Sequence, residues 1–160
     1  MKNSDESLVI ELEKLLKGGT AHIGLNDAVA NLPDNLIGRK HEHLPYSIWQ
    51  LVEHIRIAQW DMLEFSKSAI HESPEWPEGY WPKNPAPKNR AEFDKSMANI
   101  NADLDSFIEL LHNNDLHSPL AHGNGQTILS EALQIADHTA YHIAEIIIIR
   151  RLFGAWNNAI

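Results

Sequence analysis

The chain has 160 residues, of which 43% are hydrophobic and 22% charged, and its formal net charge is −9 with histidine neutral. These values fit one globular domain over residues 1–160, and the acidic balance argues against a nucleic-acid partner, which clustered lysine and arginine would attract. The absence of cysteine excludes disulfides, cysteine zinc ligands and a thiol nucleophile. No segment resembles a signal peptide or a membrane span of about 18 apolar residues, so we expect a cytoplasmic protein without a membrane partner.

Two helices are predicted in the N-terminal half. The first is predicted over residues 4–31, with Ser4 as its N-cap, a break or kink at Gly18-Gly19 and a restart at Thr20. The second is predicted over residues 47–70, which open on a Ser-x-x-Gln capping box.

Two further helices are predicted in the C-terminal half. Residues 89–113 open on a cap-like Asn-x-x-Glu, and residues 127–153 stop before Gly154. No stretch shows the sustained alternation of a strand. Four long helices in a chain of this size predict an all-α fold, a four-helix bundle.

The segment between the second and third helices, residues 71–88, is rich in proline and tryptophan. It holds five of the eight prolines, together with Trp76 and Trp81. A loop of this length is often a functional lid, but a rigid crossover packed by its own aromatic side chains is an equally good interpretation.

His138 and His142 are the most informative pair, since residues four apart share one face of a helix. Ten histidines in 160 residues give about 0.6 pairs at this spacing by chance, so the spacing alone is a weak signal. With His138 at zero, His142 falls at about 40°, Ile135 at about 60° and Ile146 at about 80° around the helix. The pair therefore lies within or beside an apolar stripe, where buried imidazoles need a partner.

A third histidine faces the core from the second predicted helix. With His54 at zero, Leu51 falls at about 60°, Ala58 at about 40° and Phe65 at about 20°, which places His54 at the core-facing edge of an amphipathic helix. Asp61 falls at about −20° on the same line. Metal sites in bundle cores are built in this way, from side chains on facing helices.

Three neutral imidazoles suit zinc, nickel, iron or copper, and we expect zinc or nickel at His54, His138 and His142. Three protein ligands leave open positions for water, as in catalytic sites, where a divalent ion generates hydroxide near neutral pH. Glu145, one turn beyond His142, is a candidate fourth ligand, orienting partner or base, and Asp61 has the same alternatives. A solvent-exposed carboxylate at the edge of a helix is an equally good interpretation of each.

The remaining histidines carry less information. His22 follows the glycine pair and is a candidate for lining the pocket, as are Trp76 and Trp81 of the crossover. The others are expected at the surface: His41, His43, His112, His117 and His122.

Five segments carry a family resemblance: Gly18-Gly-Thr-Ala-His22, residues 47–61 around Val-Glu-His54, Trp76-Pro-Glu-Gly-Tyr-Trp-Pro82, Asp137-His-Thr-Ala-Tyr-His142-Ile-Ala-Glu145, and Arg150-Arg-Leu-Phe-Gly-Ala-Trp156. Together, over nearly the whole chain, they resemble the DinB superfamily, whose YfiT-like members are classed as metal-dependent hydrolases. In that family one histidine of the second helix and a His-x-x-x-His pair of the last long helix bind a divalent metal. The resemblance places these roles on His54, His138 and His142.

The resemblance also implies a four-helix bundle in up-down-down-up order, with which the long crossover is compatible, and frequent homodimers. Members of known chemistry include thiol-dependent transferases and isomerases that use low-molecular-weight thiols, and many members have no known reaction. One departure is Glu145, which stands where the family pattern has glutamine. A carboxylate there can ligate an ion or alter the acidity of its bound water.

Four consecutive isoleucines, Ile146–Ile149, point around the whole circumference of the last helix. A helix that is apolar on every side is buried on every side, so a loop, another helix or a second subunit must cover its outer face. We favour a second subunit, which predicts a homodimer.

Three hypotheses follow. The first, which we favour, is a metal-dependent enzyme, either a hydrolase or a low-molecular-weight-thiol transferase, that acts on a small molecule beneath the Trp76/Trp81 crossover. The second is a metal or small-ligand binding protein without chemistry of its own. The third is a structural bundle whose three histidines satisfy one another.

Overall fold

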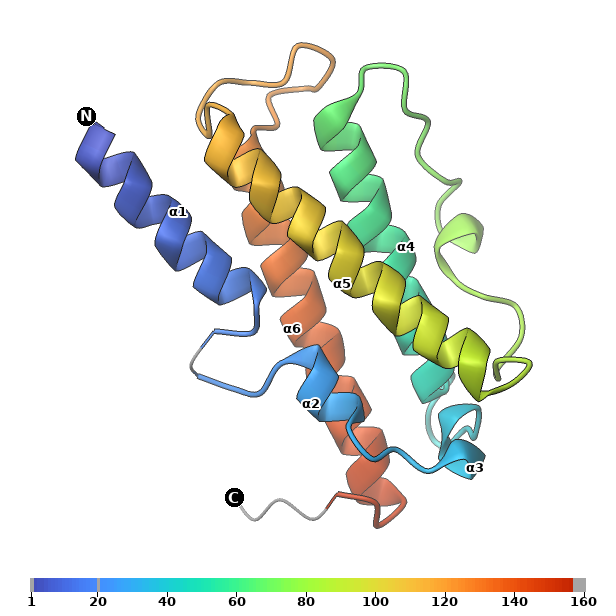
Figure 1. Ribbon diagram of the computed structural model, residues 1–160. Coiled ribbons are helices and arrows are strands. Elements are labelled where there is room, and N and C mark those ends of the chain that lie inside the picture. The colour runs from blue at the N-terminus through green and yellow to red at the C-terminus, as the bar shows by residue number, and fades with distance from the viewer. Residues whose placement is uncertain (1, 20, 157–160) are drawn as a thin grey trace.

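The computed structural model describes residues 2–19 and 21–156, with side chains from Asp5 onward, and in these ranges every regular element is a helix. The elements are α1 (Lys2–Leu16), α2 (Leu25–Val29), α3 (Asp34–Ile37), α4 (Ile48–Lys67), the 3-10 helix η1 (Glu78–Tyr80), α5 (Arg90–Asn113) and α6 (Ile128–Leu152). The all-α expectation is confirmed. In Figure 1, α4 and α5 both run from the lower to the upper end, whereas α1 and α6 run the opposite way. The crossover therefore joins two helices of the same direction.

Local capping sets where the long helices begin and end. Ser47 and Thr127 each close a capping box at the start of α4 and α6, and the Asn89 side chain caps α5. These caps satisfy backbone N–H groups that have no partner within the helix. Gly154 follows α6 with a φ of 66°, a left-handed conformation that ends a helix.

The N-terminal region differs from the single helix expected over residues 4–31. Gly18 (φ 108°) and Gly19 (φ 62°) take the left-handed conformation directly after α1, and their N–H groups bond to carbonyls of its last turn. A Cβ on Gly18 would come within 2.8 Å of the Gly24 Cα, so the chain doubles back here at a distance that only glycine permits. The second helix, α2, resumes only after this turn.

Other helix boundaries also differ from expectation. The N-cap expected at Ser4 is wrong, because α1 already begins at Lys2. The restart expected at Thr20 lies outside the described residues. The second long helix ends at Lys67, slightly before its predicted end, because Ser68 has left the helical conformation with a φ of −144°.

Two apolar clusters fill the bundle, one toward each end. One packs α2 and α3 against the first part of α4 and the last part of α6, and includes the fully buried Ile48 and Ile146. The other packs α1 against the second part of α4, the end of α5 and the start of α6, and includes Leu12 and Phe107. The long helices α4, α5 and α6 contribute to both clusters.

The candidate ligands lie where the two clusters meet. On α6, the interval 136–142 holds no buried residue of either cluster, and it contains His138 and His142. On α4, the division falls within residues 55–58, next to His54. We call this level of α4 and α6 the junction between the clusters; here polar side chains interrupt the apolar core.

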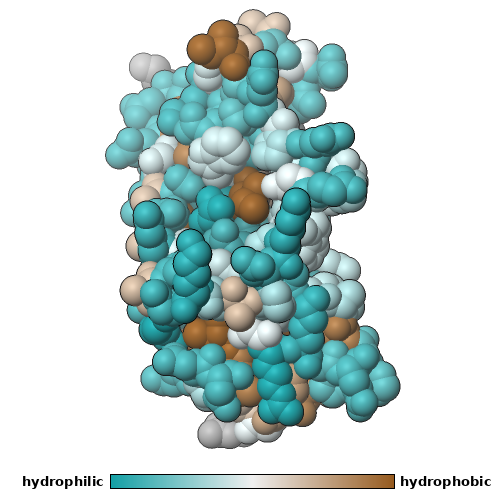
Figure 2. Space-filling view, turned by 90° about the vertical axis from the view of Figure 1, so that its right-hand side faces the viewer, coloured by the Kyte–Doolittle hydropathy of each residue, from teal (hydrophilic) through white to brown (hydrophobic). Residues whose placement is uncertain are grey.

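The surface on the crossover side is mostly hydrophilic, and hydrophobic residues there are confined to small separate patches (Figure 2). None of the helices in the described ranges combines the length and the apolar character that crossing a membrane requires.

The outer face of α6 is not fully covered within this chain. Ile146 and Ile149 are completely buried, but Ile148 is 48% exposed. The described residues of one chain therefore do not cover the isoleucine run on every side, as the sequence had led us to expect. What covers Ile148 stays a prediction.

Candidate metal centre

Three histidines from α4 and α6 converge on one point. His54 and His142 are buried and His138 is half-buried. One ring nitrogen of each lies within 4.8 Å of the others, and Nε2 of His138 is 3.0 Å from Nε2 of His54. The ring centroids are 4.5–4.8 Å apart. The fold thus brings together the three residues that the sequence predicted on facing helices.

Hydrogen bonds fix the orientation of two of these rings. Nδ1–H of His54 donates to the Tyr80 carbonyl at 3.0 Å, which leaves the lone pair on Nε2. Nδ1–H of His142 donates to Oε2 of Glu145 at 2.6 Å, with the same consequence. Metal-binding histidines in proteins are usually held in this way, with the other ring nitrogen donating to a carbonyl or carboxylate.

Glu145 connects the cluster to a tyrosine that precedes α4. Its carboxylate accepts hydrogen bonds from the Tyr46 hydroxyl and from His142. Burial, reinforced by the bond to Glu145, raises the pKa of Tyr46 above its ordinary value, so the hydroxyl stays protonated and remains a donor. Glu145 is therefore placed as an orienting partner of His142.

Burial keeps two of the imidazoles, those of His138 and His54, neutral. Burial, together with the neighbouring His142 and His54, lowers the pKa of His138 to about 4. Burial also lowers the pKa of His54, while the hydrogen bond to the Tyr80 carbonyl acts in the opposite direction. Both groups are neutral at pH 7 and keep the lone pair that a metal ion requires.

An aromatic side chain of the crossover covers the cluster. The Trp81 ring stacks on His54 with a centroid distance of 3.9 Å and an interplanar angle of 8°, and Tyr46 stacks beside Trp81 at 6.0 Å. The Gln50 amide donates to the Pro82 carbonyl at 3.0 Å and so ties the crossover to α4. Figure 1 shows the crossover descending alongside α4. This side of the cluster is closed by an apolar surface.

Asp61 lies outside the cluster and anchors the crossover. Its carboxylate accepts hydrogen bonds from the Tyr80 hydroxyl at 2.5 Å and from Nε2 of His71 at 2.7 Å. Burial, followed by the bond to Asp61, raises the pKa of Tyr80 to about 12, so this hydroxyl also remains a donor. The Tyr80 carbonyl in turn holds His54, so Asp61 and His54 bind the same crossover residue through separate groups.

Two of the three pocket candidates lie away from the cluster. His22 is exposed, has Nδ1 at 2.8 Å from the Ile23 carbonyl, and lines a cavity against a different face of α6. Trp76 is 69% exposed and packs against Tyr80 at a centroid distance of 5.4 Å. Of the three candidates, Trp81 alone contacts the histidines.

Two histidines expected at the surface are partly buried. His41 packs against the Phe153 ring at 5.7 Å, and Nε2–H of His122 donates to the Phe65 carbonyl at 2.7 Å. The expectation is wrong for these two because each finds a partner from a distant segment. It is confirmed for the remaining three, His43, His112 and His117.

Sequence reasoning does not identify three residues around the cluster: Tyr46, His71 and Tyr80. Tyr80 stands next to Trp81 in the proline-rich segment, but its two hydrogen bonds depend on the path of an irregular chain. The partners Tyr46 and Glu145 are 99 positions apart in the sequence. One signal in the sequence could have identified the two tyrosines. A tyrosine hydroxyl near a buried site needs a hydrogen-bond acceptor, and Glu145 and Asp61 are such acceptors.

The donor set fits a divalent transition-metal ion. Three imidazoles converge, and the hydrogen bonds that hold two of them, His54 and His142, leave the lone pair on Nε2. A site with three protein ligands keeps coordination positions for water or a substrate atom.

Comparison with known families places most of the chain in one family. Residues 24–146 match the family model described as the DinB superfamily, and this range contains all three histidines and Glu145. No curated protein and no solved structure gives a significant match to the chain.

Proposed function

The chain belongs to the DinB superfamily, and on that basis we propose that the cluster of His54, His138 and His142 binds zinc or nickel in a metal-dependent enzyme that acts on a small molecule. The observation that carries the proposal is the convergence of three imidazoles, two of which, His54 and His142, are held by Tyr80 and Glu145 with the lone pair left on Nε2. A merely structural cluster has no need of this shared orientation.

The proposed reaction is hydrolysis or transfer to a low-molecular-weight thiol. A bound ion would act as a Lewis acid and would increase the acidity of a water molecule or a thiol bound to it. Glu145 and Asp61, the candidate bases, each already accept two hydrogen bonds. We therefore propose positioning roles for both: Glu145 orients His142, and Asp61 holds the crossover while Trp81 excludes water from one side of the cluster.

A non-catalytic metal-binding protein is the alternative. The observation that favours it is the engagement of both candidate carboxylates, because neither Glu145 nor Asp61 is left unbonded to accept a proton from substrate. The stacked Trp81 also closes one approach to the cluster.

Metal content tests the proposal directly. Protein purified without a His-tag and supplied with zinc or nickel is expected to retain about one equivalent by mass spectrometry, because three ligands suffice for a catalytic-type site. The variants His54→Ala and His142→Ala are expected to retain almost none. The matched control is His43→Ala, which removes an exposed imidazole outside the cluster. Equal substoichiometric metal in the wild type and His142→Ala contradicts the proposal.

Activity assays separate the enzyme from the binder. Metal-loaded protein is tested first for conjugation of low-molecular-weight thiols to small electrophiles and then for ester and amide hydrolysis. Turnover that disappears in His142→Ala supports the enzyme. Full metal occupancy without turnover in any of these classes supports the non-catalytic binder.

We also propose that the protein forms a homodimer through α6. The support is a line of apolar side chains on this helix that are 48% to 64% exposed: Leu133, Tyr141, Ile148 and Leu152. In an ideal helix they lie within about 100° of one another. Light scattering is expected to give a dimeric mass for the wild type and a monomeric mass for Ile148→Glu. A monomeric wild type rejects the dimer and leaves the metal proposal unaffected.

A further inference from the structure

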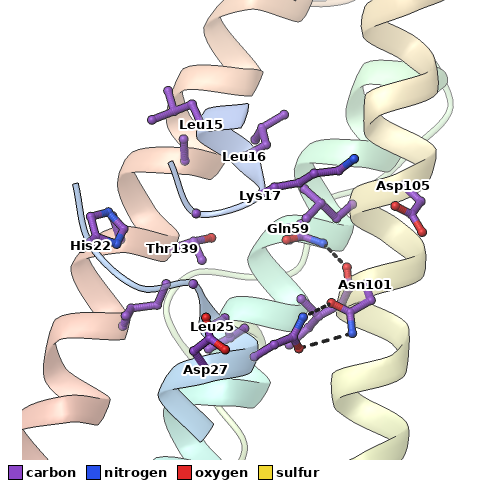
Figure 3. Close-up of a pocket in the computed structure, with 18 residues that line it drawn as sticks. Leu15, Leu16, Lys17, His22, Leu25, Asp27, Gln59, Asn101, Asp105 and Thr139 are labelled. Carbon is purple, nitrogen blue, oxygen red and sulfur yellow. Dashed lines mark hydrogen bonds between the residues drawn. The ribbon is translucent and has the colours of Figure 1, made fainter. Parts of the chain in front are cut away.

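The cavity lined by His22 lies on another face of the α4–α6 pair than the histidine cluster. Its volume is about 410 Å³, within the range of small-molecule sites, which is about 300–1,000 Å³. The end of α1, the start of α2 and parts of α4, α5 and α6 form its walls, as Figure 3 shows. Ideal helix geometry places its residue Thr139 about 100° from His138, and its residue Gln59 about 140° from His54. The cavity is therefore separate from the histidine cluster.

Gln59 supplies a buried acceptor to this cavity. The residue is 2% exposed, and its amide nitrogen donates to the Ile100 carbonyl at 2.7 Å, which fixes the orientation of the amide group. No donor among the described residues bonds to the Gln59 oxygen. Every fully enclosed polar side-chain atom in these residues has a partner, so this oxygen is not fully enclosed. The oxygen is therefore reached from the cavity. In Figure 3 it points away from α5, toward the side of Thr139.

Part of the inner surface is apolar. Leu16, Ile100 and Ile143 are buried members of the two apolar clusters, and all three line the cavity. The Thr139 hydroxyl has no hydrogen-bond partner among the described residues. A ligand that fits here needs an apolar body and a hydrogen-bond donor for Gln59.

The charges at the mouth favour a cation. Asp27 and Asp105 both line the cavity, and the one lysine there, Lys17, already donates to Glu13 at 2.6 Å. Two carboxylates therefore line the cavity together with the His22 imidazole and one ammonium, which bonds to Glu13 and is also attracted by Asp105, in a chain with a net charge of −9. Such a surface attracts cations and repels carboxylates.

We propose that this cavity binds a small organic amine. The apolar body of the amine packs against Leu16, Ile100 and Ile143, its N–H donates to Oε1 of Gln59, and Asp27 and Asp105 attract its positive charge. This proposal is independent of the metal, because no ligand of the ion takes part in it.

An NMR titration with 3-methylbutylamine tests the proposal. The full chain is ¹⁵N-labelled and treated with a chelator, so that an amine cannot bind through a metal ion. Saturable shifts are expected for amides of α2 and for residues 100–105 of α5. The uncharged 3-methylbutanol and the anionic 3-methylbutanoate have the same alkyl group, and the anion is expected to bind at least about tenfold more weakly because of repulsion at the mouth.

Variants of the lining supply the second part of the test. Ala136→Leu, which fills the cavity, and Gln59→Leu, which removes the acceptor, are each expected to weaken amine binding about tenfold. Asp27→Asn is expected to weaken it about two- to fivefold, because an exposed charge contributes little. The matched control is Asp137→Asn, which removes an exposed carboxylate of α6 outside the cavity and is expected to change nothing.

Three outcomes overturn the proposal. The first is an absence of saturation up to about 50 mM amine, which is beyond the Kd of a specific site. The second is equal binding of the amine and the carboxylate. The third is unchanged binding in Ala136→Leu, whose fold is checked by circular dichroism and which tests the site even if Gln59→Leu fails to fold.

Discussion

The α4–α6 pair has buried polar groups on two sides, the crossover side and the cavity side. The two sides differ in whether the protein itself supplies the hydrogen-bond partners of these groups. On the crossover side, Nδ1 of His54 and of His142 is bonded to Tyr80 and Glu145. On the other side, the Gln59 oxygen has no partner among the described residues and faces a cavity.

The difference indicates how each side recognises what it binds. In the histidine cluster the ring orientations are set before any ligand arrives, which lowers the entropic cost of ordering three ligands. In the cavity the walls are formed, but the hydrogen bond to Gln59 is left for a ligand to complete. The first arrangement suits an ion with strict geometric demands, and the second suits a small organic molecule.

The largest expected effect comes from removing the carboxylate that orients His142. Glu145→Ala is expected to weaken zinc binding by about 10–100-fold, the usual consequence of losing such a partner. Glu145→Gln is the matched control, because its amide oxygen can still accept from Nδ1–H, and we expect a smaller loss. Competition with a chromophoric chelator measures both affinities. Equal affinity in Glu145→Ala and the wild type shows that the orientation of His142 does not depend on this bond.

A smaller effect is expected from loosening the crossover. Tyr80→Phe removes the hydrogen bond to Asp61 and is expected to lower the free energy of unfolding by about 1–2 kcal/mol. Zinc affinity is expected to change little, because His54 bonds to the Tyr80 backbone carbonyl and not to its hydroxyl. Urea denaturation is compared with the control Tyr141→Phe, at an exposed tyrosine. A large loss of metal affinity contradicts the separation of these two roles.

On the cavity side, the free energy of unfolding is expected to rise instead of fall. Ala136→Leu places apolar atoms in the cavity and is expected to raise the free energy of unfolding by about 0.5–1 kcal/mol, without altering zinc affinity. Ala102→Leu, at an exposed position of α5, is the control for helix propensity. If Ala136→Leu is destabilised, the cavity is too tightly packed for an added side chain, and the contrast between the two sides is smaller than described.

The smallest effect concerns Glu131, a buried carboxyl in the first turn of α6. Burial, and then the charge of Asp61, raises its pKa above the ordinary 4.5. The unfolded chain therefore loses this proton at a lower pH than the folded protein, so stability falls as the pH rises through this window. Glu131→Gln is expected to have a slightly higher Tm than the wild type at pH 7, and the difference should vanish below about pH 4. If the Tm difference between Glu131→Gln and the wild type is the same at both pH values, it does not arise from the raised pKa of Glu131.

The sequence predicts those features that depend on neighbours along a helix. The caps at Ser47 and Asn89 were found because capping involves residues three positions apart. His138 and His142 were found for the same reason, since helical spacing alone places them on one face.

Features that depend on the path of an irregular segment could not be predicted. Asp61 was correctly placed on the line of His54, but its partners His71 and Tyr80 come from the proline-rich crossover. His22 was a candidate for lining the histidine site and instead lines the cavity on another face of α6, because the turn at Gly18-Gly19 directs the chain past that face.

The junction between the two apolar clusters has a consequence for how the protein opens. Apolar packing along α4 and α6 is interrupted at the level of His54, His138 and His142, and regions with fewer buried apolar contacts open locally at lower free energy. An ion bound by both helices at this level would link them where the apolar core is weakest. Removal of the metal is then expected to let the two ends of the bundle exchange their amide hydrogens as separate cooperative units, whereas the loaded protein exchanges them as one.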